Sequence, residues 1–105
     1  MMFNYLFVIF AEPKSVLASD KFLNHVARYI GRGWQQLGIH LDLTQHELFV
    51  IQANNPYDVQ NQIYQMLVKW KEKKGQKATQ KALINTMIDS SVDADWCKIY
   101  ALVGK

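Results

Sequence analysis

Apolar residues recur at intervals of three and four through nearly all of the chain after Ser19. That spacing lines one face of an α-helix, whereas a half-buried strand needs strict alternation. Only residues 6–10 could form a strand, so we expect an all-α fold of six short helices. The 105 residues support one domain, and the sequence contains no internal repeat or interdomain linker.

Helix caps and breaks divide the chain into these six helices. Asp20 is placed to cap the first, Gly31–Gly33 ends it, and the second is expected from Trp34 to Leu41. The apolar faces of these two helices are expected to carry Leu23, Val26, Ala27, Ile30, Trp34, Leu37 and Leu41.

The third helix has the clearest start. Thr44 precedes Glu47 by three residues, which is the Thr-x-x-Glu pattern of a capping box. In such a box the hydroxyl and the carboxylate each accept a hydrogen bond from a backbone amide that the helix leaves unpaired. Residues 54–56 (Asn-Asn-Pro) are expected to end this helix. Its inward-facing residues are expected to be Leu48 and Ile51.

Three more helices are expected in the second half of the chain. Pro56 is placed to open the fourth, because its missing amide hydrogen is not needed there, and Gly75 to end it. The fifth begins at Ala78 or Thr79, and the sixth covers about residues 94–103 after a break. Their expected apolar residues are Val59, Ile63, Met66, Leu67, Trp70, Leu83, Ile84, Met87, Ile88, Trp96, Ile99, Tyr100 and Val103.

Composition limits the class of protein. Half of the residues are apolar and 12% are aromatic, enough to build a modest core without metal or disulfide. The single cysteine, Cys97, cannot form an internal disulfide, so a reducing, cytoplasmic location is expected. We expect its thiol to be buried and inert beside Trp96 and Ile99, since free cysteine usually packs as a small apolar side chain.

Enzyme chemistry has no support in the sequence. The chain lacks a glycine-rich phosphate loop, an HExxH pattern and a nucleophile elbow, and its three histidines have no partner at a catalytic or metal-binding spacing. The carboxylates Asp89, Asp93 and Asp95 flank a helix break, where capping is a better explanation than metal binding. We therefore expect no enzymatic activity, cofactor or metal.

Basic charge is concentrated in one stretch. Residues 69–81 hold six lysines and one glutamate, a net charge of +5, whereas the other six basic and eight acidic residues sum to −2. Positive charges are stabilised at the C-terminal end of a helix, which explains part of this cluster. The rest indicates a contact with an acidic protein surface or with nucleic acid. Nucleic acid is the weaker alternative, because only Trp70 accompanies the lysines, and Trp34 and Trp70 share the spacing of core residues.

The N-terminal residues 1–19 are expected to form an arm outside the domain of residues 20–105. Residues 1–10 are too short to span a bilayer and lack the basic start and cleavage pattern of a signal peptide. An apolar arm that packs on the domain or on a neighbour is expected. Attachment to a membrane surface is the weaker alternative.

The third helix also indicates a contact surface. If Leu48 and Ile51 face inward, at least one of Phe49 and Val50 must face solvent. Exposed apolar side chains of this size are typical of interaction sites, although single ones are common.

From about Phe22 onward the sequence resembles a death domain. The residues that carry the resemblance are Gly33-Trp34-Gln35-Gln36-Leu37, Leu41, Leu48, Ile51, Asn55-Pro56, Leu67-Val68-Lys69-Trp70, Gly75, Ala78-Thr79 and Leu83. Residues 53–60 and 77–80 are most similar to death domains of RAIDD-type adaptors, and the helix spacing is also similar to the FADD and insect IMD types.

The resemblance implies an antiparallel six-helix Greek-key bundle without enzymatic activity. It implies homotypic binding of other death domains through asymmetric patches, as an adaptor or scaffold in apoptotic or innate-immune signalling, with possible self-association into larger assemblies. The implied partner-binding residues are Arg28, Arg32, Glu47, Phe49, Val50, Gln52, Asn54, Tyr57, Asp58, Lys71, Lys73, Lys74, Lys77, Asp89, Asp93 and Asp95. Such adaptors carry a second domain, so an excised domain, a truncated isoform and a single-domain inhibitor all stay open. Reversing charge at Lys73 and Lys74 is expected to weaken partner capture and leave unfolding nearly unchanged.

Overall fold

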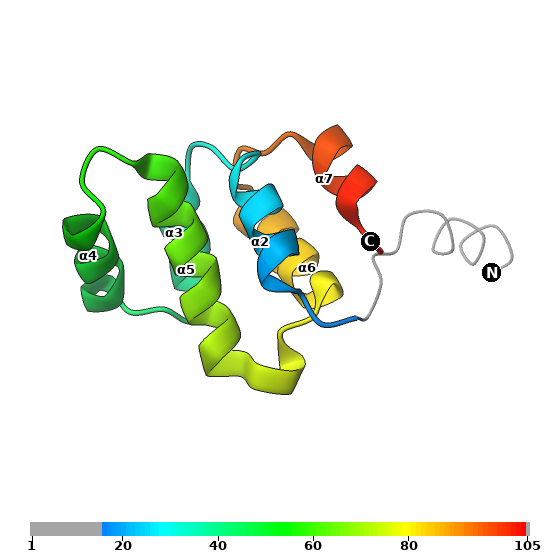
Figure 1. Ribbon diagram of the computed structural model, residues 1–105, viewed down its shortest axis with the longest axis horizontal. Coiled ribbons are helices and arrows are strands. Elements are labelled where there is room, and N and C mark those ends of the chain that lie inside the picture. The colour runs from blue at the N-terminus through cyan, green and yellow to red at the C-terminus, as the bar shows by residue number, and fades with distance from the viewer. Residues whose placement is uncertain (1–15, 105) are drawn as a thin grey trace, which may run out of the picture.

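The computed structural model describes residues 16–104, which form six α-helices and one short 3-10 helix (Figure 1). In chain order these are α2 (Asp20–Ala27), α3 (Trp34–His40), α4 (Gln45–Asn54), α5 (Val59–Lys74), η1 (Gly75–Lys77), α6 (Gln80–Ser90) and α7 (Trp96–Leu102). Across residues 16–104 the β-type pairings are two isolated bridges, Leu17 with Thr79 and Ile30 with Ala94. The expected all-α fold of six helices is confirmed.

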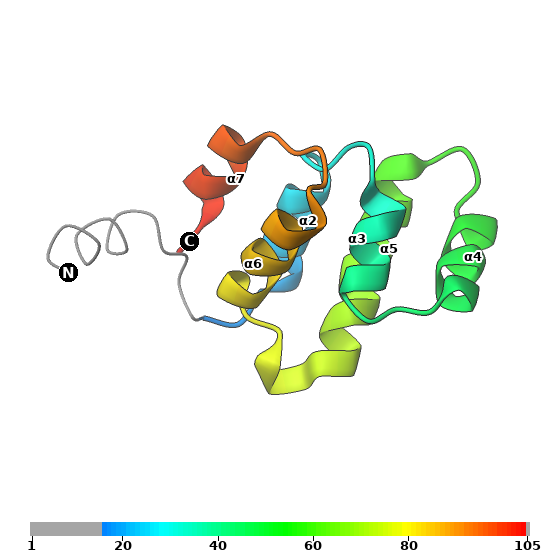
Figure 2. The same ribbon diagram turned by 180° about the vertical axis from the view of Figure 1, so that it is seen from behind.

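The helices lie in two layers. In one layer α2 packs beside α5, and in the other α3 packs beside α6, as the two opposite views show (Figures 1 and 2). At one end of the bundle α4 packs against α5 and α3. At the other end α7 packs against α2. This order places α4 and its connection to α5 at the far end of the molecule from α7.

A single apolar core joins these layers. Trp34 and Trp70 are 5% and 3% exposed, which confirms that they are core residues rather than exposed stacking platforms. The largest fully buried side chains come from five of the six helices and the loop after α3: Leu23, Val26, Leu37, Leu41, Ile63, Met66, Leu67, Leu83, Ile84, Met87 and Ile99, together with the polar Gln80.

Side-chain caps fix where the helices begin. The capping box of α4 is confirmed, with the Glu47 amide donating to Thr44 Oγ1 at 3.1 Å and the Thr44 amide donating to Glu47 Oε1 at 2.8 Å. Thr79 caps α6, which therefore begins at Gln80, just after the expected start at Ala78 or Thr79. The first helix is capped by Ser19 rather than Asp20, because the Ser19 hydroxyl accepts from the Phe22 amide.

The expected start of the fourth helix at Pro56 is wrong. The helix α5 begins at Val59, and Asp58 caps it by accepting from the Asn61 amide at 3.0 Å. Val59 is 55% exposed instead of buried. Gln62 takes the first buried position on α5, because its side-chain amide donates to the Asn55 carbonyl at 2.9 Å.

Two other expected apolar positions also face outward. Ile88 is 51% exposed and Tyr100 is 41% exposed, because Met87 and Ile99 occupy the inward direction of α6 and α7. The last helix is shorter than expected, since Asp95 caps it and it begins at Trp96. The predicted strand at residues 6–10 and most of the predicted arm lie outside the described residues.

Candidate interaction surfaces

Four exposed side chains gather at the α4 end of the molecule. Phe49 is 67% exposed and Val50 is 38% exposed on α4, and Val59 is 55% exposed in the first turn of α5. Tyr57, in the loop between these helices, is fully exposed. We call these four residues the α4–α5 corner. The prediction that at least one of Phe49 and Val50 faces solvent is confirmed for both.

The loop that carries Tyr57 is held by the side chain and carbonyl of Asn55. The side-chain nitrogen Nδ2 of Asn55 donates to the Ile51 carbonyl at 2.8 Å. Its side-chain oxygen Oδ1 accepts from Asn61 Nδ2 at 2.6 Å. The Gln62 side chain donates to the Asn55 carbonyl. Tyr57 itself has a left-handed backbone, with φ of 64°. The exposed tyrosine is therefore presented on a loop tied to both α4 and α5.

A shallow groove of about 380 Å³ runs between α4 and α5. Val50 and Ile51 line it from α4, and Val68 lines it from α5. Asn54 is exposed at its edge, and Gln52 is half-buried on the same helix. Because Val50 lines the groove and belongs to the α4–α5 corner, the groove lies directly beside that corner.

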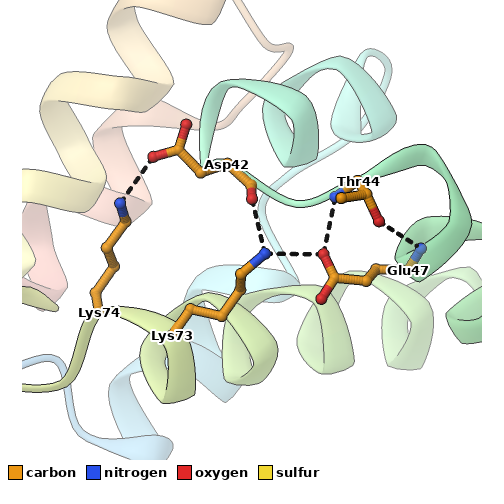
Figure 3. Close-up of polar contacts among 5 residues, drawn as sticks. All are labelled: Asp42, Thr44, Glu47, Lys73 and Lys74. Atoms are coloured by element: carbon orange, nitrogen blue, oxygen red, sulfur yellow. Dashed lines mark hydrogen bonds and ion pairs between the residues drawn. The ribbon is translucent and has the colours of Figure 1, made fainter.

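The lysines near the end of α5 are engaged inside the domain. Lys73 Nζ lies 2.9 Å from Glu47 Oε1 and donates to the Asp42 carbonyl at 2.8 Å (Figure 3). Lys74 Nζ lies 2.7 Å from the Asp42 carboxylate (Figure 3). These contacts tie the C-terminal turn of α5 to the α3–α4 loop and to the first turn of α4.

The pKa values of two carboxyl groups at this site are lowered. The pKa of Glu47 falls from 4.5 to about 2, first because the Thr44 amide donates to it and then because of Lys73. The pKa of Asp42 is also lowered, mainly by the hydrogen bond and charge of Lys74. Both groups are therefore ionised at neutral pH, where the ion pairs are formed.

Lys71 makes a third ion pair. Its Nζ lies 3.1 Å from the Asp20 carboxylate, so it joins α5 to the start of α2. Three of the four lysines expected to bind a partner are thus paired within the chain, although each side chain keeps about a third of its surface exposed. Lys77, on η1, is exposed and makes no ion pair with any residue between 16 and 104.

The arginines and the C-terminal acidic residues come together at another corner. The Gly31 amide donates to the Asp93 carbonyl at 2.8 Å, and the Asp93 amide donates to the Arg32 carbonyl at 3.0 Å. A shallow pocket of about 450 Å³ beside these bonds is lined by Arg28, Asp93 and Asp95. Both charge signs therefore share one surface, here called the α2–α7 charged corner.

The acidic residues of the last break have different roles. Asp95 caps α7 by accepting from the Lys98 amide at 3.2 Å, as expected of a cap. Asp89 is exposed on α6, and neither its side chain nor that of Asp93 makes a hydrogen bond or ion pair within residues 16–104. The capping interpretation is wrong for these two, because neither precedes a helix start.

The prediction of a buried Cys97 is also wrong. The thiol is exposed, because only Ile99 of α7 is fully buried and Cys97 lies on a different face of that short helix. In the described part of the chain no three His, Cys, Asp or Glu side chains are close enough to hold a metal ion. None of the helices described here is long and apolar enough to cross a membrane.

The residues described here form six helices in this order around a core that contains two buried tryptophans. The sequence model of the death domain matches residues 20–94. The chain belongs to the death-domain family. A death domain is a protein–protein interaction module of signalling proteins and not an enzyme, so the exposed corners are candidate partner surfaces.

The tertiary partners of the lysines were missed by sequence reasoning. Lys71 and Asp20 are 51 residues apart, and no local pattern links them. The role of Asn55 was also missed, although an Asn-Pro pair after a helix is a recognisable loop signal. The exposure of Val59 was also missed, because α5 begins at Val59 itself and its first turn faces solvent.

Proposed function

We propose that this death domain binds other death domains homotypically, as an adaptor or scaffold in cytoplasmic apoptotic or innate-immune signalling. The observation that carries the proposal is the exposure of Phe49 and Tyr57 on elements that the Asn55 hydrogen bonds hold in place. Large aromatic side chains on an ordered surface contribute strongly to protein interfaces. We propose residues 20–105 as the interaction domain and residues 1–19 as an N-terminal arm that the hydrogen bonds of Val16 and Ala18 attach to it.

The two corners support an asymmetric mode of association. The α4–α5 corner is apolar and aromatic, whereas the α2–α7 charged corner carries both charge signs. A surface that is not self-complementary meets a different surface on the next subunit, and such contacts can extend into larger assemblies. The charged groups would steer encounter and register more than they add affinity.

Capture by an immobilised death domain of a RAIDD-type adaptor tests this role. Phe49→Ser should weaken capture at least tenfold, because truncation of a central aromatic contact costs about 2 kcal/mol or more. Ile88→Ser is the matched control, since Ile88 is half exposed on α6, away from the corner. Equal losses in both variants, or in neither, would contradict the proposed surface.

A role of the lysines near the end of α5 in partner binding needs a different test from charge reversal at Lys73 and Lys74. Glutamate at positions 73 and 74 would face the carboxylates of Glu47 and Asp42, so unfolding would not stay unchanged. Lys77→Glu is the cleaner test, because Lys77 is exposed on η1. A drop in capture with unchanged unfolding would support a basic contact there, and unchanged capture would remove Lys77 from the surface.

The pairing of Lys71, Lys73 and Lys74 with carboxylates weighs against the nucleic-acid alternative. Each paired lysine would have to leave a protein carboxylate to neutralise a phosphate. Binding of a duplex or single-stranded probe that falls steeply with salt would revive that alternative.

A further inference from the structure

A second groove lies between the start of α2 and the end of α7. Its volume is about 230 Å³, and its walls are Ser19, Lys21, Phe22 and His25 from the α2 side and Leu102 from α7. Pockets for small molecules usually measure roughly 300–1,000 Å³, so this groove is better sized for side chains of a peptide segment. It lies at the opposite end of the molecule from the α4–α5 corner (Figure 1).

Gln80 joins Val16 to Gly104 beside this groove. Its amide donates to the Val16 carbonyl at 2.8 Å, and its side-chain oxygen accepts from the Gly104 amide at 2.8 Å. The Gln80 side chain is 1% exposed, so this link is part of the folded body. The Ala18 amide also donates to the Ala78 carbonyl at 2.8 Å. The position at which the N-terminal residues leave the domain is therefore set.

The chain that leaves at this position is strongly apolar. Nine of residues 1–10 are apolar, with Asn4 the exception, and five residues separate this run from Val16. Five extended residues span about 17 Å, which is ample to reach a groove whose wall begins at Ser19. Val16 and Leu17 are 48% and 47% exposed, so an apolar surface continues from the groove toward the exit point.

We propose that residues 1–10 dock in cis on the groove between α2 and α7. The apolar run would cover Leu102 and the edge of Phe22, and removal of this apolar area from water favours the docked state. The tether keeps the segment close to the groove, so binding needs no second molecule. The inference depends on the fold and not on the identity of a death-domain partner.

The exposed, single Cys97 allows a direct test in the full chain. A nitroxide spin label on Cys97 would lie about 7.5 Å from Leu102 along the axis of α7. Docking predicts strong line broadening of the amide signals of residues 1–10, unchanged on dilution. Phe7→Asp with Ile9→Asp should remove this broadening, and these positions lie outside residues 16–104, so the signals of the folded body report whether it is intact.

A groove variant and its control complete the experiment. Leu102→Asp should also abolish the broadening, whereas Val59→Asp, at the other end of the molecule, should leave it unchanged. Broadening that appears only in mixtures of labelled and unlabelled chains would overturn the proposal in favour of a second copy. Signals of residues 1–10 that are unbroadened alone and lost only on phosphatidylcholine vesicles would overturn it in favour of a membrane surface.

Discussion

Gly38 marks the closest approach of α3 to its neighbours. A Cβ atom at this position would lie 2.7 Å from Leu48 Cδ2 and 3.0 Å from Met66 Sδ. Side chains of α4 and α5 thus occupy the space that any other residue would need. Any other residue here would force the Leu48 and Met66 side chains to shift, so glycine is favoured by packing and not by a left-handed backbone.

Gly38→Ala is therefore expected to destabilise the domain. Overpacking costs about 1–3 kcal/mol, of which the better helix propensity of alanine returns up to about 1 kcal/mol. Chemical denaturation of both proteins measures the difference. Gly31→Ala is the control, because its Cβ would lie 3.7 Å from the nearest atom, on Asp93. Equal stability of the two variants would contradict the packing described.

The depressed pKa of Glu47 predicts a pH dependence of stability. Its pKa is about 2 in the folded state against 4.5 for the free group. The contribution of ionised Glu47 to the free energy of unfolding is therefore complete above pH 4.5 and is lost as the pH falls toward 2. Glu47→Gln should remove this part of the acid sensitivity. The free energy of unfolding is measured for both proteins at neutral pH and between pH 4.5 and 2. The two values should approach each other as the pH falls through this range. Parallel curves would show that Glu47 is not protected in the folded state.

Charge at single residues was only partly predictable. The capping role of Glu47 follows from Thr44 three residues earlier, since that pattern is local. Its pairing with Lys73 depends on how α5 packs against α4, which no local spacing reveals. The exposure of Cys97 was missed for the same reason, because the way α7 packs on the domain decides which of its faces is covered.

At the level of the elements, Asn55 connects α4 to α5. Asn55→Ala would remove its bonds to the Ile51 carbonyl and to Asn61. Loss of these part-buried hydrogen bonds is expected to cost about 1–3 kcal/mol. Asn54→Ala is the matched control, since the exposed Asn54 side chain makes no hydrogen bond with the described residues, and it should change stability by less than about 0.5 kcal/mol.

The readout is thermal or chemical unfolding of both variants. If Asn55→Ala matched the wild type, the loop between α4 and α5 would not depend on these bonds. A loosened loop should also reduce capture of a partner, because Tyr57 would no longer be held at the corner. Asn54→Ala is a control for stability alone, because Asn54 is itself one of the residues expected to contact a partner and lies at the edge of the groove.

Element boundaries were predictable where a local signal dominates. Thr44, Gly75 and Thr79 mark helix ends in the structure as the sequence indicates. The start of α5 was not predictable from Pro56, because Asn55 and the left-handed Tyr57 extend the loop to Asp58. The proline position alone would favour a helix start at Pro56. The hydrogen bonds of Asn61 and Gln62 to Asn55 instead keep the loop before Asp58 out of the helix.

At the scale of the molecule, the fold brings distant segments into shared surfaces. The α2–α3 connection lies beside the α6–α7 connection, through the bridge of Ile30 with Ala94 and the bond from Asp95 to the Tyr29 carbonyl. Arg28 and Asp93 are therefore neighbours, although the sequence places them at opposite ends of the domain. The family resemblance predicted the helix order but not which charges would already be paired.

The proposed self-association and binding to other death domains rest on two unlike corners of one subunit. Such a subunit can contact one neighbour through each corner. Loss of the aromatic side chains of the α4–α5 corner should stop growth while leaving the folded monomer intact, because Phe49 and Tyr57 are exposed.

Light scattering of the full chain across a concentration series, alone and mixed with an adaptor death domain, tests this account most directly. We expect a complex larger than a dimer, reduced to a smaller species by Phe49→Ser with Tyr57→Ser and unchanged by Ile88→Ser. A chain that stays monomeric with every death domain, or a complex that both variants form equally, would contradict it.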